Sequence, residues 1–447
     1  MIIHENTTPP PAPSFYLTHV NSDPLNRDFQ DEQQVNDESR LVTRGKGEIL
    51  NFSTSPHFNH KEISPLPKGI LLFHAIILQL FAIGWLMTFA SFASADPTIV
   101  AQQPRPPWLQ LASLIEDEKR PIISLENKKI KSSWALALDN DALAFGDRDR
   151  DYTFGMNLTY SGTRASDAII SLKTPLAGID DSLGLEEVTE NSQSHYSVET
   201  GIYGFTPADT SQREINNRDR PYASMFYFSS SHDRIDSENN IAWKTTLTIG
   251  ALGLGIAGKL QSATHELISA KEARGWNHQI SDGGELTGRY VIARQHYLES
   301  FSQSLEVKST LQASVGYLTE ASWSLSFRSG KIISPWATFN PDLTTYGEKS
   351  TYSNNTTSFN EHYFWAGLTL KARLYNAFLQ GQLRDTDWSY AHESLRPIIM
   401  EAWAGYTYAF KEGYRISYVL RAQTSEIKSG DGNRNMVWGG LIFAKTI

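Results

Sequence analysis

The chain has 447 residues, no cysteine, a mean hydropathy of −0.37 and a formal net charge of −9. This composition excludes disulfides, thiol nucleophiles and cysteine-ligated metals, is too polar for a bundle of membrane-spanning helices, and argues against nucleic acid as a partner. The length accommodates either two or three soluble domains or one large β-barrel.

The first region in chain order, residues 1–68, is rich in proline, asparagine and serine and shows no hydrophobic period. Such a segment cannot bury a core, so we expect it to be disordered. It precedes a segment that resembles an export signal, and such signals normally begin at the N-terminus. We therefore expect residues 1–68 to be an over-extended reading frame, with the true start between Leu66 and Ile70.

The second region, residues 69–95, is continuously apolar and follows Lys68. It ends in Ala93-Ser94-Ala95, a small-x-small site, and Asp96-Pro97 comes next. This pattern predicts a secretory signal peptide that is cleaved after Ala95. A transmembrane anchor is the alternative, and the cleavage site favours processing.

Residues 96–131 carry prolines and charges and are expected to be a periplasmic lead-in, whereas a period of two dominates residues 132–447. Apolar residues alternate with polar ones in several long segments: 152–160, 305–317, 321–328, 364–374 and 414–421. A soluble β-sandwich alternates too. These segments of about 9–16 residues are longer than soluble strands, and an export signal precedes them, so a transmembrane barrel is the better interpretation.

The pattern thus predicts an all-β protein, a transmembrane antiparallel β-barrel in the outer membrane of a Gram-negative bacterium, which we expect to be a monomer. About thirteen segments are recognisable, but bacterial barrels have even strand numbers, so we expect twelve strands. Short turns at 318–320 and 411–413 are expected on the periplasmic side. The polar stretches 163–193 and 329–358 are expected to be extracellular loops.

One segment, residues 258–276, breaks the alternation and predicts a helix of about four turns. Gln261, His265 and Glu272 would share one face of it, because positions i, i+4 and i+11 superpose at 3.6 residues per turn. A pore has no need of a polar helix that carries histidine. The segment therefore indicates a site.

Three short motifs on the strands carry further polar groups. Asn140-Asp141 ends the first strand, Asp151-Tyr152-Thr153 opens the second, and Asp219-Arg220-Pro221-Tyr222-Ala223 opens the fourth. Taken alone, each has an ordinary reading as a turn or a strand start. A lone histidine such as His265 is likewise more often packed or solvated than catalytic.

Taken together and in this order, the motifs resemble the outer-membrane lipid A 3'-O-deacylase family, the LpxR-like calcium-dependent barrel esterases. The helical Gln261-x-x-x-His265 with Gly275-Trp276-x-x-Gln279 belongs to the match, and so do Leu374–Gly381 and Val419–Glu426 in the carboxyl half. The resemblance covers roughly residues 132–447. Each motif is weak, but the whole set in this order along a barrel pattern is strong.

The resemblance implies a Ca²⁺-dependent hydrolase that removes the 3'-linked acyloxyacyl chain of lipid A in the outer leaflet. It implies His265 as the base that deprotonates water, with Asn140 and Asp141 as calcium ligands and Thr153 as a polar site residue. Arg220 would face a lipid A phosphate, and Tyr222 and Gln261 would line the substrate site. Glu272 is the expected carboxylate partner of His265 on helix geometry, with Glu266 as the alternative.

The residues themselves agree in part, because no G-x-S-x-G elbow or Ser-His-Asp set stands out, so water activation by histidine is preferable to a serine nucleophile. Adjacent strand residues point to opposite faces, so Asn140 and Asp141 reach one ion only at a bulge or a strand end.

This chain also departs from the family at several positions. Asn277-His278 replaces the usual Asp-Asn pair, Gln380 replaces an aspartate, and the last strand lacks a terminal aromatic residue. A phospholipase-type esterase and a non-catalytic barrel or pore therefore remain alternatives. If His265 is not the base, His278 or His296 is the next candidate.

Overall fold

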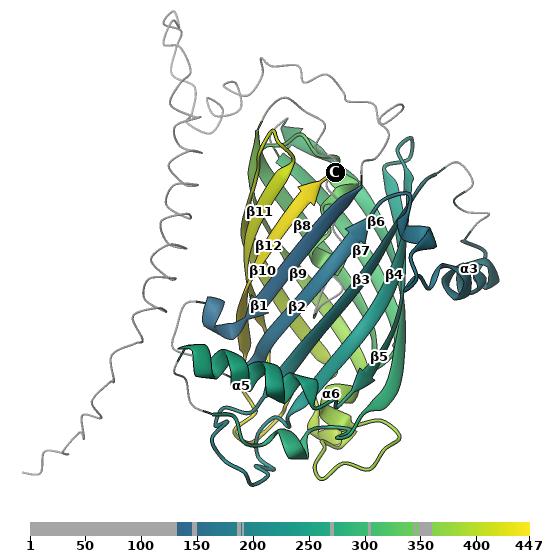
Figure 1. Ribbon diagram of the computed structural model, residues 1–447. Helices are drawn as coiled ribbons and strands as arrows, with labels where there is room; N and C mark the ends of the chain where they lie inside the picture. The colour runs from purple at the N-terminus through teal and green to yellow at the C-terminus, as the bar shows by residue number, and fades with distance from the viewer. Residues whose placement is uncertain are drawn as a thin grey trace, which may run out of the picture. The chain divides into compact units, whose positions relative to one another are not determined.

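The computed structural model describes residues 132–144, 150–185, 189, 192–268, 272–302, 305–343, 346 and 360–447. Within this part of the chain, twelve strands form one closed antiparallel barrel (Figure 1). Each strand pairs with its neighbours in sequence, and β1 closes the barrel against β12. The predicted all-β barrel and its twelve strands are thereby confirmed. The predictions for residues 1–68, 69–95 and 96–131 lie outside the described residues.

The strands are 8 to 18 residues long. They are β1 (Ser133–Asn140), β2 (Asp151–Ser161), β3 (Gln193–Thr206), β4 (Ala223–Asp236), β5 (Ile241–Leu252), β6 (Glu285–Ser302), β7 (Leu305–Gly316), β8 (Leu318–Lys331), β9 (Glu361–Asn376), β10 (Ile398–Ala409), β11 (Tyr414–Gln423) and β12 (Met436–Thr446). The α-helices in the described residues are α3 (Lys173–Ser182), α5 (Ile256–Ile268) and α6 (Ala377–Gln380). None of the described helices has the length and apolarity needed to cross a membrane.

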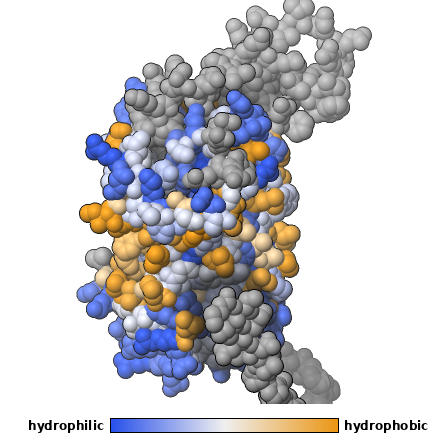
Figure 2. Space-filling view, turned by 90° about the vertical axis from the view of Figure 1, so that its right-hand side faces the viewer, coloured by the Kyte–Doolittle hydropathy of each residue, from blue (hydrophilic) through white to orange (hydrophobic). Residues whose placement is uncertain are grey.

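The alternation in the sequence separates a polar lumen from an apolar outer wall. On β2, for example, Asn157 and Thr159 are buried inside the barrel, whereas Met156 and Leu158 are each 43% exposed on the outside. Figure 2 shows the result on one face of the barrel, where hydrophobic side chains form a band across the middle, between hydrophilic ends. Only alternate strand residues have to meet lipid, which explains how a polar composition forms a membrane barrel.

The two ends of the barrel differ, and we name them by what they carry. The terminal end is where β1 begins and β12 ends, and the helix end is where α5 connects β5 to β6. Successive connections alternate between the ends. The turn at Tyr317, between β7 and β8, therefore lies at the helix end, and the 410–413 turn, between β10 and β11, lies at the terminal end.

The prediction that both tight turns lie on one side is consequently wrong. Three strands, β8 to β10, separate them, and an odd number of strands returns the chain to the opposite end. The two stretches predicted as extracellular loops, 163–193 and 329–358, belong to connections at the terminal end, which they share with the 411–413 turn. Turn length alone does not reveal the side, because either end of a barrel can carry a short hairpin.

Part of the β8–β9 connection folds into the lumen instead of forming an outer loop. The Lys308 ammonium of β7 lies 3.0 Å from both the Asn340 side-chain oxygen and the Asp342 carboxylate. Phe339 packs edge-on against Tyr363 and Trp365 on the inner wall. These apolar and charge-paired contacts explain why the segment is buried, against the prediction of an extracellular loop for 329–358.

Ion pairs fill much of the remaining lumen. Glu320 accepts from Arg373 at 2.7 Å and from Arg289 at 3.3 Å, and Glu401 bridges Lys371 and Arg421 at 2.5 and 2.6 Å. An aromatic cluster occupies the half nearer the helix end: Tyr152, Tyr203, Phe205, Tyr227, Tyr317, Tyr346, Phe378 and Trp438. Buried charges are tolerated inside a protein when each is paired, so the interior is a packed core.

A short helix, α3, is fastened to the outer wall through a buried carboxylate. Asp180 on α3 accepts hydrogen bonds from Arg234 at 2.7 Å, Thr245 at 2.8 Å and Tyr290 at 2.8 Å. By strand parity these three side chains all point outward from β4, β5 and β6. Asp180 thus ties the helix to three strands at once.

A serine and a histidine adjoin this carboxylate. The Ser194 hydroxyl lies 3.0 Å from His232 Nε2, and His232 Nδ1 lies 4.0 Å from Asp180. The tertiary structure therefore assembles a Ser-His-Asp group that the sequence does not reveal. Because both Asp180 oxygens already accept from Arg234, Thr245 and Tyr290, its geometry serves to attach α3.

Candidate active site

The helical interruption predicted for 258–276 is a shorter helix that lies outside the barrel. Helix α5 spans Ile256–Ile268, residues 272–275 are not helical, and a single 3₁₀ turn follows at Trp276–His278. In Figure 1, α5 lies across the ends of the strands on the outer side of the wall, and its C-terminal turn is directed towards the end of β1. The predicted helix is present, but the prediction extends it to residue 276, beyond its observed end at Ile268.

The first polar residue of the wall at this end of the barrel is Asn140, the last residue of β1. By strand parity it shares the outward face with Trp134 and Leu136. Its side-chain oxygen accepts from the Ala142 backbone N–H at 2.6 Å, and its Nδ2 donates to the Thr153 carbonyl. This cap turns the chain at the end of β1. The Asp141 side chain therefore need not point to the face opposite Asn140, as it would on a regular strand.

Thr153 is the extra residue of a β-bulge in β2. The pairing with β3 shifts between Tyr152 and Phe154, which turns Tyr152 into the lumen and Phe154 outward. The Thr153 hydroxyl lies 2.6 Å from the hydroxyl of Thr206, the last residue of β3. Thr206 was not predicted as a site residue, although its parity with Ile202 and Gly204 would have placed it on the same outward face.

Two buried polar residues of α5 face this wall. Gln261 is 3% exposed and His265, one turn further on, is 6% exposed. A polar residue is seldom buried without a role in hydrogen bonding or chemistry. The structure thus confirms that Gln261 and His265 share one face of the helix, and that this face is turned inward.

Trp276 holds the helix against the barrel. Its indole nitrogen donates to Gln261 at 2.7 Å, and its ring packs against Tyr222 and Phe154 at centroid distances of 5.0 and 6.4 Å. A Cβ at Gly258 would lie 2.9 Å from the indole, so the ring requires glycine at this point of α5. Tyr222 and Gln261, predicted to line a substrate site, both contact Trp276 and so help to hold α5 against the barrel.

Glu272, the predicted carboxylate partner of His265, does not lie on the helix. It falls in the non-helical segment after α5, its side chain is 65% exposed, and its carboxylate pairs with Arg274 at 3.0 Å. The helix geometry that suggested Glu272 is absent because α5 ends before it. The alternative, Glu266, is also exposed.

Arg220, predicted to meet a phosphate, points into the barrel mouth. It is 3% exposed, its guanidinium lies over the Phe205 ring at 4.9 Å, and Nε lies 3.8 Å from Asp151. The neighbouring Asp219 accepts from Arg434 at 2.6 Å. Asp219 and Arg220 therefore form ion pairs at the mouth of the barrel, and their side chains do not point towards the outer wall on which α5 packs.

A cation at the end of β1 would find oxygen ligands of the kind that calcium prefers. Asn140 and Asp141 are adjacent in the chain, and the Asn140 amide donates to the Thr153 carbonyl. Asp141 is 1% exposed. Among the described residues, no three histidine, aspartate or glutamate side chains gather as a metal-binding group. Calcium, unlike zinc, accepts amide and backbone carbonyl oxygens, so the donor set fits it.

Comparison with known proteins agrees with this architecture. The family model described as "Outer membrane protein LpxR" matches residues 86–446. The solved structure of LpxR from Salmonella typhimurium matches with a TM-score of 0.53 and 17% sequence identity, over 70% of this chain and 100% of that one. A search of curated proteins finds no match.

More distant barrels also align. The KdgM porin matches with a TM-score of 0.30 and 5% identity, over 70% of this chain and 99% of that one. The β domain of the Bordetella autotransporter BrkA matches with a TM-score of 0.33 and 7% identity, over 72% of this chain and 100% of that one.

Proposed function

The chain belongs to the family of the outer membrane protein LpxR, and from this membership we propose that it is a hydrolase of the outer membrane that removes the 3'-linked acyloxyacyl chain of lipid A. The observation that carries the proposal is the set of polar residues at the helix end: Gln261 and His265 are buried on the inward face of α5, and Asn140 and the Thr153–Thr206 pair lie on the outward face of the wall. Lipid acyl chains lie against that wall, so chemistry placed there meets a lipid ester without passing through the lumen.

In the proposed reaction, His265 accepts a proton from water as the water oxygen attacks the ester carbonyl carbon. The bond from that carbon to the sugar 3'-oxygen then breaks, and the 3'-oxygen takes the proton that His265 had accepted. The products are a 3'-hydroxyl and a free fatty acid. Thr153, fixed by Thr206, would orient the ester or the water beside the histidine.

Calcium is part of the proposal. Asn140, Asp141 and the Thr153 carbonyl would hold the ion, and a bound Ca²⁺ would supply polarisation of the ester carbonyl. Titration calorimetry should detect Ca²⁺ binding to the wild type and lose it in Asp141→Ala, and chelation should abolish hydrolysis. Full activity in excess chelator would remove calcium from the mechanism.

The orientation follows from the same proposal. An even strand number puts the start of β1 and the end of β12 at one end, opposite α5. An exported chain enters the membrane from the periplasm, so we place the terminal end there and the helix end at the outer leaflet, where lipopolysaccharide lies.

The alternatives have less support. A phospholipase-type esterase would use the same wall site and differ only in the headgroup it accepts. The paired charges and the inward-folded 334–343 segment weigh against an open pore. Mass spectrometry of lipid A from cells with and without the protein tests the proposal directly. Lipid A that keeps its 3' chains in expressing cells would contradict it.

A further inference from the structure

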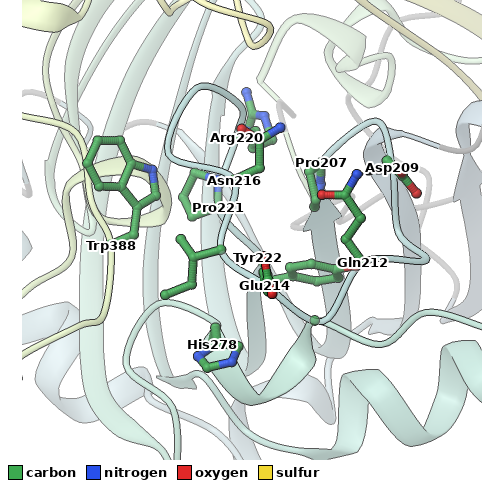
Figure 3. A pocket seen from close by; sticks show the side chains of 12 residues that line it. Pro207, Asp209, Gln212, Glu214, Asn216, Arg220, Pro221, Tyr222, His278 and Trp388 are labelled. Atoms are coloured by element: carbon green, nitrogen blue, oxygen red, sulfur yellow. Dashed lines mark hydrogen bonds between the residues drawn. The ribbon is translucent and has the colours of Figure 1, made fainter.

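A cleft opens at the helix end, beside the wall site but separate from it (Figure 3). The β3–β4 connection forms one side, and residues of the β5–β6 and β9–β10 connections form the other. Its lining residues are Pro207, Asp209, Gln212, Glu214, Ile215, Asn216, Arg220, Pro221, Tyr222, Gly275, His278 and Trp388. Figure 3 shows Trp388 and Gln212 on opposite sides, with Tyr222 and His278 between them.

Two polar groups that line the cleft have no hydrogen-bond partner among the described residues, and a third is bonded through only one of its two ring nitrogens. The Trp388 indole nitrogen is buried and donates to no described residue. No described residue bonds the Glu214 carboxylate, which is exposed in the cleft wall. An unpartnered buried donor costs free energy of folding, so it is retained at such a place when a ligand or water satisfies it.

The third group is His278, whose orientation is fixed by Asp387. His278 Nδ1 lies 2.6 Å from the Asp387 carboxylate. A carboxylate only accepts hydrogen bonds, so Nδ1 carries the proton in this pair, and Nε2 is left for a second partner. The cleft therefore presents a donor at Trp388, an acceptor at Glu214 and the Nε2 atom of His278.

The cleft is joined mechanically to the wall site. Tyr222 lines the cleft, and its ring also packs against Trp276, which Gln261 of α5 holds. The Tyr222 hydroxyl donates to the Thr210 carbonyl at 3.1 Å, which ties down the β3–β4 connection. A ligand in the cleft would contact Tyr222, and the rings of Tyr222 and Trp276 connect it to α5, the helix that carries His265.

The charges select the class of ligand. Asp209 and Glu214 are anionic, while the Arg220 guanidinium is committed to Phe205, Asp151 and Met436 within the barrel mouth. No lysine or arginine among the described residues that line the cleft is left to pair with a phosphate. A hydroxylated ring would gain hydrogen bonds from both donors and acceptors, and apolar contact with the Trp388 and Tyr222 rings.

We propose that this cleft binds a saccharide of the lipopolysaccharide headgroup, neutral or amino-substituted, while the acyl chains lie along the wall beneath α5. The proposal deepens the proposed function and rests on it for the identity of the substrate. It assigns Trp388, Glu214 and His278 to binding the sugar.

Binding of lipid-free saccharides to the purified full-length barrel tests the cleft without relying on catalysis. The two probes are the fully deacylated lipid A disaccharide and the core oligosaccharide released from rough lipopolysaccharide. We expect at least one of them to bind the wild type by calorimetry. Glu214→Gln keeps the shape but removes the charge and one acceptor oxygen, and Trp388→Phe keeps an aromatic ring but removes the indole N–H, so each should weaken binding by about tenfold.

A matched control is Glu238→Gln, an exposed glutamate in the β4–β5 turn at the terminal end, which should bind as the wild type does. Binding of the disaccharide assigns the cleft to the sugars of lipid A itself, and binding of the core oligosaccharide alone assigns it to the attached sugars. In the second case, the variants should raise KM about tenfold for rough lipopolysaccharide and leave KM for free lipid A unchanged.

The outcomes separate this proposal from the proposed function. A wild type that binds a saccharide and hydrolyses no lipid A would overturn the function and leave the cleft assignment standing. A wild type that hydrolyses lipid A but binds neither probe, with variants that keep every KM, would overturn the cleft. Unaltered heat-modifiable migration on gels confirms that each variant is folded.

Discussion

At the scale of single residues, the proposed site depends on a histidine that a helix buries against a membrane-facing wall. His265 is buried on α5, and Asn140 and the Thr153–Thr206 pair lie on the outward face of the wall at the same end of the barrel. Histidine is the side chain among these that most often serves as a general base. The others can hold and orient.

Replacement of His265 tests whether this residue is the general base. Positioned proton transfer contributes about 10²–10⁴-fold to a rate, so His265→Ala should lose at least that much hydrolysis. His265→Gln keeps a hydrogen-bonding group but cannot take the proton, so it should not restore the rate. Hydrolysis of lipid A by purified protein is the measurement. A folded His265→Ala protein with near wild-type rate would shift the base to His278 or His296.

A second residue, Glu426, makes stability depend on pH. Burial by itself would raise the pKa of Glu426, but the Arg373 and Arg220 guanidinium groups hold that pKa below its ordinary value. Arg373 lies 2.6 Å and Asn376 Nδ2 2.7 Å from its carboxylate. A group whose pKa is lowered on folding stabilises the folded state above its unfolded pKa, about 4.3 for glutamate, and loses this effect as pH falls through the folded pKa.

Glu426→Gln should therefore be less stable than the wild type at pH 7, by about 1.5–3 kcal/mol for a hydrogen-bonded charge. The difference should persist down to about pH 4.3 and shrink below it. The temperature of the heat-modifiable gel shift, recorded at several pH values, measures this. A difference that stays constant to pH 2 would refute the electrostatic explanation.

At the scale of elements, α5 is an attachment to the barrel and not part of its hydrogen-bonded wall. Contacts with Trp276, Ile202 and Tyr222 hold it in place, and Gly258 lets the indole approach. Changes in α5 should therefore lower activity without preventing barrel assembly, because the hydrogen-bonded strands close the barrel without the helix.

Two helical glycines form a matched pair for testing this. A Cβ at Gly258 on α5 would lie 2.9 Å from Trp276, whereas a Cβ at Gly178 on α3 would meet nothing within 4 Å. Gly258→Ala should displace the indole and lower hydrolysis by about tenfold, equivalent to about 1.4 kcal/mol. Gly178→Ala should leave hydrolysis unchanged, since alanine favours the helix by up to about 1 kcal/mol. Equal activity in both variants would show that Trp276 does not set the position of α5.

At the scale of the whole molecule, the packed lumen separates this barrel from a channel. Lys308 anchors the inward-folded 334–343 segment, and Glu320 and Glu401 each bridge two cations. Breaking such buried pairs is costly because it leaves an uncompensated charge, so the interior should stay closed to ions.

Planar bilayers should therefore record no steady conductance from the purified protein, while an open porin reconstituted in the same way conducts. The expectation concerns the native barrel at neutral pH, where the paired charges are intact. Regular single-channel openings from the wild type would restore the pore alternative.

The amino-acid sequence by itself determined the barrel, its twelve strands and the order of the motifs, because alternation and strand length are local properties of the chain. It also marked Asn140, Thr153, Gln261 and His265. Tertiary structure decided what depends on distant contacts: the ends at which the turns lie, the inward fold of 334–343, the early end of α5, and the loss of Glu272 and Arg220 from the site. It alone brought Thr206 to Thr153 and placed Glu214 and Trp388 in the lining of one cleft, because pairing register and packing, which no local pattern encodes, set those positions.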